Sequence, residues 1–271
     1  MKLSSKILLA MLIILVSGLL MSNIVLKKEF NKIDKSDLYW NYTKVFTQSF
    51  RYIKIDGGNI TNIAFEQSKN CSVRILNSWE RDHPQLLKTS VKKDTLFIKF
   101  IYTPENQYEK DWMKQANLVR IFSPEILSVN GFNTNFGMFK LKQKSIAVNI
   151  SGKSEFEVES MIPDMDSIDV VQRDSAAVEF EMSPDYKSTK KTDTVMNKAV
   201  QIHFGDNPPP AGTGSDEIKS NEAMNINSVK ADLTGHTILD IGHAQIQTLQ
   251  LHISDSSAII LSGGALKKIA K

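Results

Sequence analysis

The sequence predicts an all-β fold: a single-stranded right-handed parallel β-helix-like solenoid with about 20–21 residues per coil, preceded by one N-terminal apolar helix. Three observations favour it. The chain begins with a long uncharged segment, its later segments alternate between apolar and polar residues, and its second half repeats at a nearly constant spacing. With 41% hydrophobic and 23% charged residues among 271, the composition is that of a globular protein rather than a disordered or collagen-like one.

The N-terminal apolar segment runs from Ile7 to Leu26, twenty consecutive residues without a charge. As a helix rising about 1.5 Å per residue it spans about 30 Å, the thickness of a bilayer hydrocarbon core. We therefore expect a signal-anchor or transmembrane helix that contacts a membrane through Ile7 to Leu26. Lys2 and Lys6 precede the segment and Lys27 and Lys28 follow it, so the positive-inside rule assigns no orientation.

Two other interpretations of this segment stay open. A cleavable signal peptide would have the same basic start, an apolar run from Ile7 to Val16, and small residues at Ser17, Gly18 and Ser22 near cleavage sites. An ordinary buried helix is the third interpretation, and it is disfavoured because nearly all faces of the helix are apolar. The anchor and the signal peptide both place the rest of the chain outside the cytoplasm.

Short β-patterned segments follow a polar stretch from Lys27 to Gln48. Each alternates apolar and polar side chains, which is typical of a half-buried strand, and turn formers such as Asp56–Asn59 or Pro124 bound them. The expected strands are Phe50–Ile55, Ile60–Phe65, Ser72–Leu76, Leu96–Ile101 and Leu118–Phe122. We expect Tyr102–Asn117, between the last two, to form a loop or one helical turn.

A repeated unit occupies the second half of the sequence. It consists of an apolar residue, then small or polar residues centred on Gly or Asp, then a second alternating strand. The instances are Val129–Gly131, Ile150–Gly152, Val171–Asp174, Leu233–Gly235 and Ile253–Asp255. Their spacings are 21, 21, 62 and 20 residues, and 62 is close to three units of about 20.7 residues. Two short strands joined at a corner predict coils that stack to bury their inward side chains.

The domain organisation follows from these segments. Residues 1–26 form the signal-anchor or transmembrane helix, 27–47 a juxtamembrane linker, 48–266 the β-helix domain and 267–271 a basic tail. Within the domain, Ala199–Phe204 is an expected strand, whereas Ser183–Asn197 and Asp206–Glu222 are expected to leave the repeat as loops. Insertions in repeat proteins often lie on the binding face, so these two loops are candidate contact segments.

Charge and cysteine content exclude several classes of function. The chain has 33 basic and 30 acidic residues, and the first 35 residues carry a net charge of +4, which leaves −1 for the rest. Such a nearly neutral body lacks the basic face that nucleic-acid binding requires. The single cysteine, Cys71, excludes an intrachain disulfide and a cysteine-based zinc cluster, and its place at a strand start predicts a small hydrophobic side chain.

An acidic stretch is the first candidate for chemistry. Asp164, Asp166, Asp169 and Asp174 provide oxygen ligands of the kind that calcium prefers. The glycine turn and the terminal glutamate of a calcium loop are missing, which favours a polar turn between coils.

The second candidate is a pair of residues next to the corners. A polysaccharide-active β-helix enzyme would need an acid/base pair, or a calcium site with a basic residue, on one face. The residues that precede the corners are Ser128, Asn149, Val170, Asp232 and His252. Only Asp232 and His252 could cooperate as neighbours in adjacent coils, and they lack a nucleophile or second carboxylate.

Other chemistry-bearing residues form no recognisable site. The histidines are His83, His203, His236, His243 and His252, and their spacing matches no metal-ligand motif. No phosphate-binding loop or nucleophile elbow occurs. We therefore predict no catalytic residues, no cofactor-binding residues, no cofactor and no metal ligands.

Aromatic residues gather next to the apolar helix at Tyr39–Tyr42. Their position favours an interfacial belt or a cap over the first coil, with a ligand platform as the alternative. Trp79 and Trp112 are expected in loops and fit either interpretation.

The residues that resemble a known family lie in three places. They are Phe50–Gly57, Val119–Gly131 and the repeated Ile-Ser-Gly-like corners. In this order they resemble the putative auto-transporter adhesin head GIN domain family over roughly Phe50 to Leu266. The resemblance implies a β-helical envelope protein of Gram-negative bacteria behind a signal sequence, and it implies no catalytic residue set. This chain departs from the family at Arg173 and Asp255, where corners lack glycine, and in its two excursions.

The expected function is therefore a non-enzymatic cell-envelope or surface interaction module that binds an unidentified protein or glycan through loops on one face. The alternatives are a polysaccharide-active β-helix enzyme and a structural or signalling envelope protein. We expect the body to be membrane-anchored in the periplasm or on the surface of a Gram-negative bacterium, or secreted if the N-terminus is cleaved. No nucleic-acid partner and no small-molecule cofactor are expected.

Overall fold

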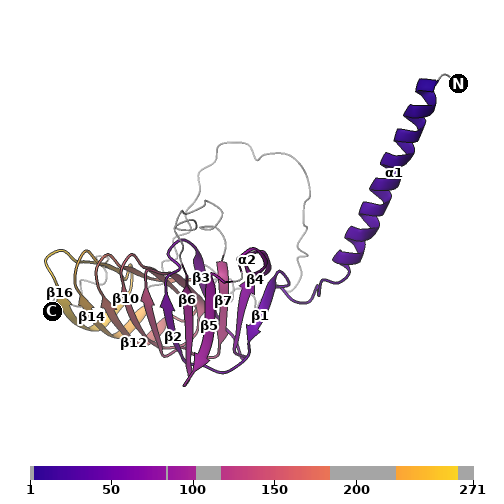
Figure 1. The fold of residues 1–271 in the computed structure, drawn as a ribbon. Coiled ribbons are helices and arrows are strands. Elements are labelled where there is room, and N and C mark those ends of the chain that lie inside the picture. The colour runs from indigo at the N-terminus through magenta and orange to yellow at the C-terminus, as the bar shows by residue number, and fades with distance from the viewer. Residues whose placement is uncertain (1–2, 84, 102–116, 184–223, 262–271) are drawn as a thin grey trace, which may run out of the picture. The chain divides into compact units, whose positions relative to one another are not determined.

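A computed structural model describes residues 3–83, 85–101, 117–183 and 224–261 (Figure 1). They belong to two compact units, Met1–Thr43 and Lys44–Lys271. Several sequence-based expectations lie outside the described residues: the loop 102–116 with Trp112, nearly all of the excursion that begins at Ser183, the strand 199–204, the excursion 206–222, and the basic tail 267–271.

The first unit contains the helix α1 (Leu3–Phe30), which includes the whole expected apolar segment. Its part from Lys6 to Phe30 is long and apolar enough to cross a membrane, and none of its most hydrophobic window is buried against protein. The expectation of an N-terminal apolar helix is therefore confirmed. Further along this unit, the rings of Tyr39 and Tyr42 meet edge to face with centroids 6.2 Å apart.

The second unit consists of two β-sheets and a short helix, α2 (Asn77–Asp82). In spatial order, the nine-stranded sheet consists of β1 (Tyr42–Phe46), β4 (Ser72–Leu76), β7 (Asn117–Ser123), β3 (Asn62–Gln67), β9 (Asn135–Leu141), β11 (Glu155–Ser160), β13 (Ala177–Met182), β15 (Ile238–Asp240) and β17 (Ala258–Ile260). The eight-stranded sheet consists of β16 (Gln245–Ile253), β14 (Asn225–Leu233), β12 (Asp164–Gln172), β10 (Ser145–Ser151), β8 (Ser128–Phe132), β2 (Tyr52–Asp56), β6 (Thr95–Phe100) and β5 (Leu87–Lys92).

The prediction of a single-stranded right-handed parallel β-helix-like solenoid is wrong. The described strands form two mixed sheets in a sandwich-like arrangement, with β4 antiparallel to β7 in one sheet and β5 antiparallel to β6 in the other. Strand order also departs from chain order, because β2 lies between β8 and β6, and β3 lies between β7 and β9. A repeat length shows which residues recur, but it does not show how the strands are divided between sheets. The period alone therefore led to the wrong architecture.

The repeat itself corresponds to parallel strand pairs. Among the described strands from β8 onward, the chain alternates between the two sheets, and each strand pairs in parallel with the next strand of its sheet. Paired residues are about one repeat apart, except that β12 and β14 pair residues 61 positions apart, about three repeats. One row of inward residues in the eight-stranded sheet illustrates this: Ile53, Val129, Val148, Val170 and Ala231 lie side by side, and all are buried. Because alternate residues of a strand point to opposite faces, such rows place the apolar side chains in one core between the sheets.

Turns with a left-handed backbone lead from the eight-stranded to the nine-stranded sheet. They contain Asn133, Gly152, Asp174 and Gly235, with φ of 50°, 72°, 65° and 87°. The last three lie where the sequence predicts corners. Gly131 does not: it is buried inside β8, where an added Cβ would lie 2.6 Å from a neighbouring threonine methyl group. Close packing therefore accounts for this glycine, and Asn133 makes the turn.

Candidate functional site

A groove of about 370 Å³ lies on the outer face of β5, β6 and β2. We call it the lysine–aromatic groove. It is lined by Lys54, Asp56, Lys88, Ser90, Lys92, Phe97, Ile98 and Lys99. Most of these residues alternate with the buried residues of their strands, so they point away from the core.

Strand register brings the groove residues together from distant parts of the sequence. Lys54 of β2 lies beside Phe97 of β6, and Phe97 lies opposite Ser90 of β5. One pleat along, Lys99 lies between Asp56 and Lys88. The antiparallel β5–β6 hairpin therefore adds the lysines of β5 to those of β2 and β6 on this face of the sheet.

The electrostatics of the groove are dominated by positive charge. Lys99 Nζ lies 3.1 Å from Asp56 Oδ2, so these two charges compensate each other. Among the residues that the structure describes, Lys54, Lys88 and Lys92 have no ion-pair partner. The groove thus combines three uncompensated ammonium groups with an exposed aromatic ring.

Exposed aromatic rings continue around the groove. Phe97 is 36% exposed within it, and Tyr52 on β2 and Phe132 on β8 are 37% and 48% exposed beside it. All three belong to adjacent strands of one sheet face, since β2 pairs with both β6 and β8. Register places the rings at three successive positions across these strands, since Phe97 lies beside Lys54 and Phe132 beside Asp56, two and four residues after Tyr52.

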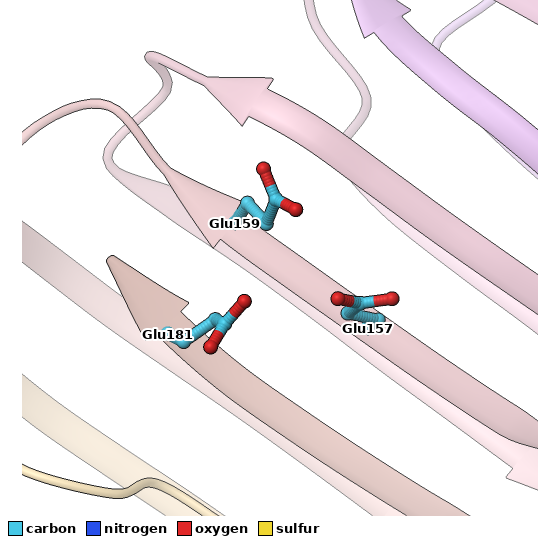
Figure 2. Close-up of side chains that lie close together, drawn as sticks. All are labelled: Glu157, Glu159 and Glu181. Atoms are coloured by element: carbon cyan, nitrogen blue, oxygen red, sulfur yellow. The ribbon is translucent and has the colours of Figure 1, made fainter. Parts of the chain in front are cut away.

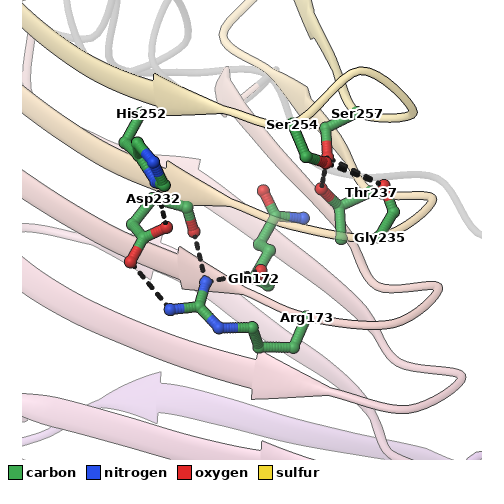
Figure 3. Close-up of polar contacts among 8 residues, drawn as sticks. All are labelled: Gln172, Arg173, Asp232, Gly235, Thr237, His252, Ser254 and Ser257. Carbon is green, nitrogen blue, oxygen red and sulfur yellow. Dashed lines mark hydrogen bonds and ion pairs between the residues drawn. The ribbon is translucent and has the colours of Figure 1, made fainter.

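The sequence-predicted pair Asp232 and His252 is in contact. Register places the two residues side by side on β14 and β16, and His252 Nδ1 lies 3.0 Å from Asp232 Oδ1 (Figure 3). A third residue completes the group, because Arg173 Nη2 donates to Asp232 Oδ2 at 2.7 Å. The repeat therefore located a real juxtaposition but did not indicate the arginine.

The Arg173–Asp232–His252 group does not favour acid/base catalysis. The hydrogen bond from Arg173, and then that from His252, holds the pKa of the Asp232 carboxyl below its usual range. A carboxylate kept ionised by two donors is a poor general acid, and both of its oxygens are already accepting hydrogen bonds. Arg173 Nη1 also donates to the carbonyls of Gln172 and Asp232, which ties β12 to β14.

The hydroxyl groups near this end of the sheet stabilise a turn. Ser257 Oγ donates to the Gly235 carbonyl at 2.8 Å and lies 3.0 Å from Thr237 Oγ1 and 2.9 Å from Ser254 Oγ (Figure 3). These partners are hydroxyl and carbonyl groups rather than a base. The arrangement therefore connects successive turns and does not activate a serine nucleophile.

The four aspartates that suggested a calcium loop do not converge. Asp164 accepts a hydrogen bond from Asn225 Nδ2 at 2.9 Å, and Asp166 accepts a longer one, 3.4 Å, from Asn227 Nδ2. Asp169 lies beside Lys230 of β14, and Asp174 Oδ2 accepts a hydrogen bond from the backbone N–H of Gly152, in the preceding turn, at 2.9 Å. Asp164, Asp166 and Asp169 thus lie within strand β12, and only Asp174 lies in a turn, so the expected polar turn accounts for one of the four aspartates.

Among the residues that the structure describes, three carboxylates do converge, and they lie on the nine-stranded sheet. Glu157 and Glu159 of β11 and Glu181 of β13 each have a carboxylate oxygen within 4.8 Å of the others (Figure 2). We call these three residues the carboxylate cluster. Ser183 Oγ donates to Glu159 Oε2 at 3.3 Å. The arrangement provides oxygen ligands of the kind that hard cations prefer.

Burial and mutual repulsion shift the titration of this cluster. Desolvation raises the pKa of Glu157, and the carboxylates of Glu159 and Glu179 raise it further. Desolvation also raises the pKa of Glu181, with Glu179, Glu157 and Asp240 adding to the effect. The signal for this cluster was present in the sequence, because Glu155–Glu159 and Glu179–Glu181 alternate acidic and apolar residues at a spacing of one repeat.

Several other residues that the sequence analysis named pack against the protein or lie in turns. Trp79 was expected in a loop but is 4% exposed within α2, with its ring centroid 4.7 Å from that of His83. Cys71 Sγ lies 3.5 Å from Ser123 Oγ and packs partly against the core, as expected of a small hydrophobic side chain. His236 and His243 are exposed in turns.

Comparisons with known proteins give distant matches only. No family model matches the chain, and no curated protein matches it. Solved structures with similarity include a putative adhesin from Bacteroides fragilis (TM-score 0.34), a putative adhesin from Parabacteroides merdae (0.32) and a putative lipid binding protein from Parabacteroides distasonis (0.32). Each is 14% identical and covers 82% of this chain, and the chain covers 96%, 95% and 94% of them, respectively. TM-scores this low describe partial overlap of the backbones, so neither the fold nor the function of this chain follows from them.

Proposed function

We propose that this chain is a non-enzymatic interaction module of the cell envelope, anchored in a membrane by α1, with its β-sheet body outside the cytoplasm in the periplasm or at the surface. The observation that carries the proposal is the lysine–aromatic groove, an exposed concave surface with unpaired charges and aromatic rings on a rigid sheet. Its partner is a protein or a glycan.

The anchor part of the proposal rests on α1. Its large hydrophobic side chains are exposed to the surroundings, from Ile7 at 54% to Phe30 at 55%, and water is a poor environment for that much apolar surface. Lys27 and Lys28 in the last turn suit the membrane–water interface. A cleaved signal peptide would export the same body without holding it at the membrane.

The binding part rests on the eight-stranded sheet. Its strands hold the groove residues at fixed register, so the surface exists without any rearrangement. The candidate catalytic pair, by contrast, is held in a closed set of hydrogen bonds with Arg173. The loops expected at Ser183–Asn197 and Asp206–Glu222 remain a second proposed contact region.

Protease accessibility on intact and osmotically opened cells, with N-terminal sequencing of the recovered protein, tests the location. Cleavage of the body only after opening, with Met1 retained, supports an anchored periplasmic module. Cleavage on intact cells with a processed N-terminus supports a surface or secreted module instead. A body that becomes accessible only after the inner membrane is dissolved would contradict the proposal, because it would lie in the cytoplasm.

A further inference from the structure

The lysine–aromatic groove has the charge of a site for an anion. Three lysines without ion-pair partners line it among the described residues, and its one carboxylate, Asp56, is compensated by Lys99. Lysine presents a compact charge on a flexible stem, which suits single anionic groups at variable positions better than one bidentate group. The first requirement on the ligand is therefore negative charge.

The spacing of the lysines favours a chain with repeated charges. Lys88 and Lys92 lie four residues apart on the outer side of β5, about 13 Å along the strand, and the Ser90–Phe97 pair lies between them. Lys54 adds a third charge two strands away, on the far side of Phe97. A polymer with anionic groups at intervals can engage all three, whereas one small anion engages only some of them.

The aromatic rings specify what lies between the charges. Phe97 is exposed at the centre of the lysine positions, and Tyr52 and Phe132 are exposed on the neighbouring strands. An aromatic face offers apolar area to the carbon-bound hydrogens of a sugar ring, and Tyr52 adds a hydroxyl. A concave groove also accepts a single chain more readily than it accepts the flat surface of a bilayer.

We infer that the lysine–aromatic groove binds an anionic polysaccharide chain, with Lys54, Lys88 and Lys92 contacting its acidic groups and Phe97 packing against a sugar ring. The inference rests on the proposed function, because a location outside the cytoplasm is what selects a glycan over a nucleic acid. The nearly neutral charge of the body after residue 35 also disfavours a nucleic acid as the ligand.

Binding of defined polysaccharides to the full-length chain in a non-ionic detergent tests the inference. Polygalacturonate and heparin serve as anionic probes, and fully methyl-esterified polygalacturonate provides the same backbone without charge. We expect both anionic probes to bind, the esterified chain to bind at least about tenfold more weakly, and affinity to fall as salt is raised. Equal binding of the charged and esterified chains, or no binding of either anionic probe, would overturn the inference.

Matched variants test the location of the site. Lys54→Gln combined with Lys92→Gln should weaken polygalacturonate binding about tenfold, and Phe97→Leu should weaken it several-fold, since each removes an exposed contact. Lys230→Gln is the control, because Lys230 is an exposed lysine on the same sheet but on β14. Unchanged binding in the first two variants, with unfolding temperatures close to the parent, would place the site elsewhere and refute the assignment.

A lipid headgroup is distinguished from a glycan by a soluble probe, dihexanoyl phosphatidylglycerol. Binding of this lipid, abolished by the double lysine variant and without binding of polygalacturonate or heparin, would replace the glycan with a lipid. Failure of the glycan assay with a body shown to be outside the cytoplasm removes the ligand assignment alone. A cytoplasmic body removes the proposed function itself.

Discussion

The strands from β8 onward and the strands before β8 are built in different ways. In the later region, neighbouring strands are parallel and in register, so residues of the same type stack on one another, as Phe136 and Phe156 do with ring centroids 5.3 Å apart. In the earlier region, antiparallel pairs interrupt this order, and β2 lies beside strands that are distant in sequence.

The two regions consequently carry different surfaces. Regular stacking places like charges together, and the carboxylate cluster with its raised pKa values lies in the repeated region. The inserted β5–β6 hairpin instead brings lysines, an aspartate and an aromatic ring to one face. Repetition thus gives a uniform scaffold at some electrostatic cost, whereas the interruption of the repeat gives a chemically mixed groove.

The largest effect is expected where the repeated region depends on register. Gly235 has φ of 87°, and an added Cβ would lie 2.5 Å from the backbone oxygen and 2.9 Å from the backbone nitrogen of Asp174 in the preceding turn. Gly235→Ala should therefore lower the free energy of unfolding by about 3 kcal/mol, from backbone strain and the clash between stacked turns. Urea denaturation of the full-length chain in detergent measures it.

Gly242→Ala is the matched control for this substitution. Gly242 has a left-handed φ of 52°, but an added Cβ would meet nothing closer than 3.9 Å. Gly242→Ala should therefore lower the free energy of unfolding only by the cost of the left-handed backbone, about 1 kcal/mol. Equal effects of the two substitutions would show that stacking of the turns contributes nothing, and the contrast between the two regions would lose its basis.

The difference between the regions also explains what the sequence could predict. Alternation located the strands around Ile53, Val73 and Val119, and the repeat placed Asp232 beside His252. Both signals are local or strictly periodic. The architecture was missed because a period does not reveal how strands are shared between sheets.

The lysine–aromatic groove was missed for a related reason. It requires β2 to pair with β6, which lies 43 residues further along the chain, and β6 to pair with β5, a strand that the alternation analysis did not assign. No repeat relates these strands, and their polar residues resemble any solvated strand face. The carboxylate cluster, in contrast, follows the repeat, because Glu157 of β11 pairs with Glu179 of β13, but it lies within strands and not next to the corners.

The earlier region should respond to turn chemistry instead of register. Lys93 and Asp94 form the two-residue turn of the β5–β6 hairpin, with φ of 45° and 65°, a conformation that favours asparagine over lysine at the first position. Asp94 is already held, since its carbonyl accepts from the N–H groups of Arg51 and Tyr52. Lys93→Asn should raise the free energy of unfolding by about 0.7 kcal/mol.

Lys93→Ala is the control for Lys93→Asn, because it removes the same charge without favouring a left-handed backbone. Thermal unfolding of both variants alongside the parent measures the difference. If alanine stabilises as much as asparagine, then charge and not turn geometry limits this hairpin.

Relief of repulsion in the repeated region should give a smaller gain. The pKa of Glu157 is raised in the folded state, so the ionised side chain destabilises the fold. Stability therefore falls as the pH rises from the ordinary glutamate pKa to the raised pKa, and the full loss is present above it. Glu157→Gln should therefore stabilise the protein at pH 7 by about 0.5 kcal/mol after allowance for solvent screening. The gain should vanish below about pH 4.

Glu155→Gln is the control, on the same strand but beside Asn135 and Ala177 rather than other carboxylates. Unfolding temperatures of both variants at pH 7 and pH 3.5 distinguish the explanations. A gain from Glu157→Gln that persists at pH 3.5, or an equal gain from Glu155→Gln, would indicate that repulsion within the cluster is not its cause.

The smallest effect is expected at Asp232, where the repeated region places opposite charges together. Because Arg173 and His252 lower the pKa of Asp232, the group stabilises the fold above the ordinary aspartate pKa, and this contribution is lost as pH falls through the lowered value. The side chain is 41% exposed, so Asp232→Asn should cost about 0.3 kcal/mol at pH 7 and less than that at pH 2. Thermal unfolding at both pH values, with Asp169→Asn as the exposed control on the adjacent strand, measures this. A loss several times larger would mean that the arginine bridge fastens β12 to β14 more strongly than a solvated ion pair can, and that polar contacts hold the register together with the core.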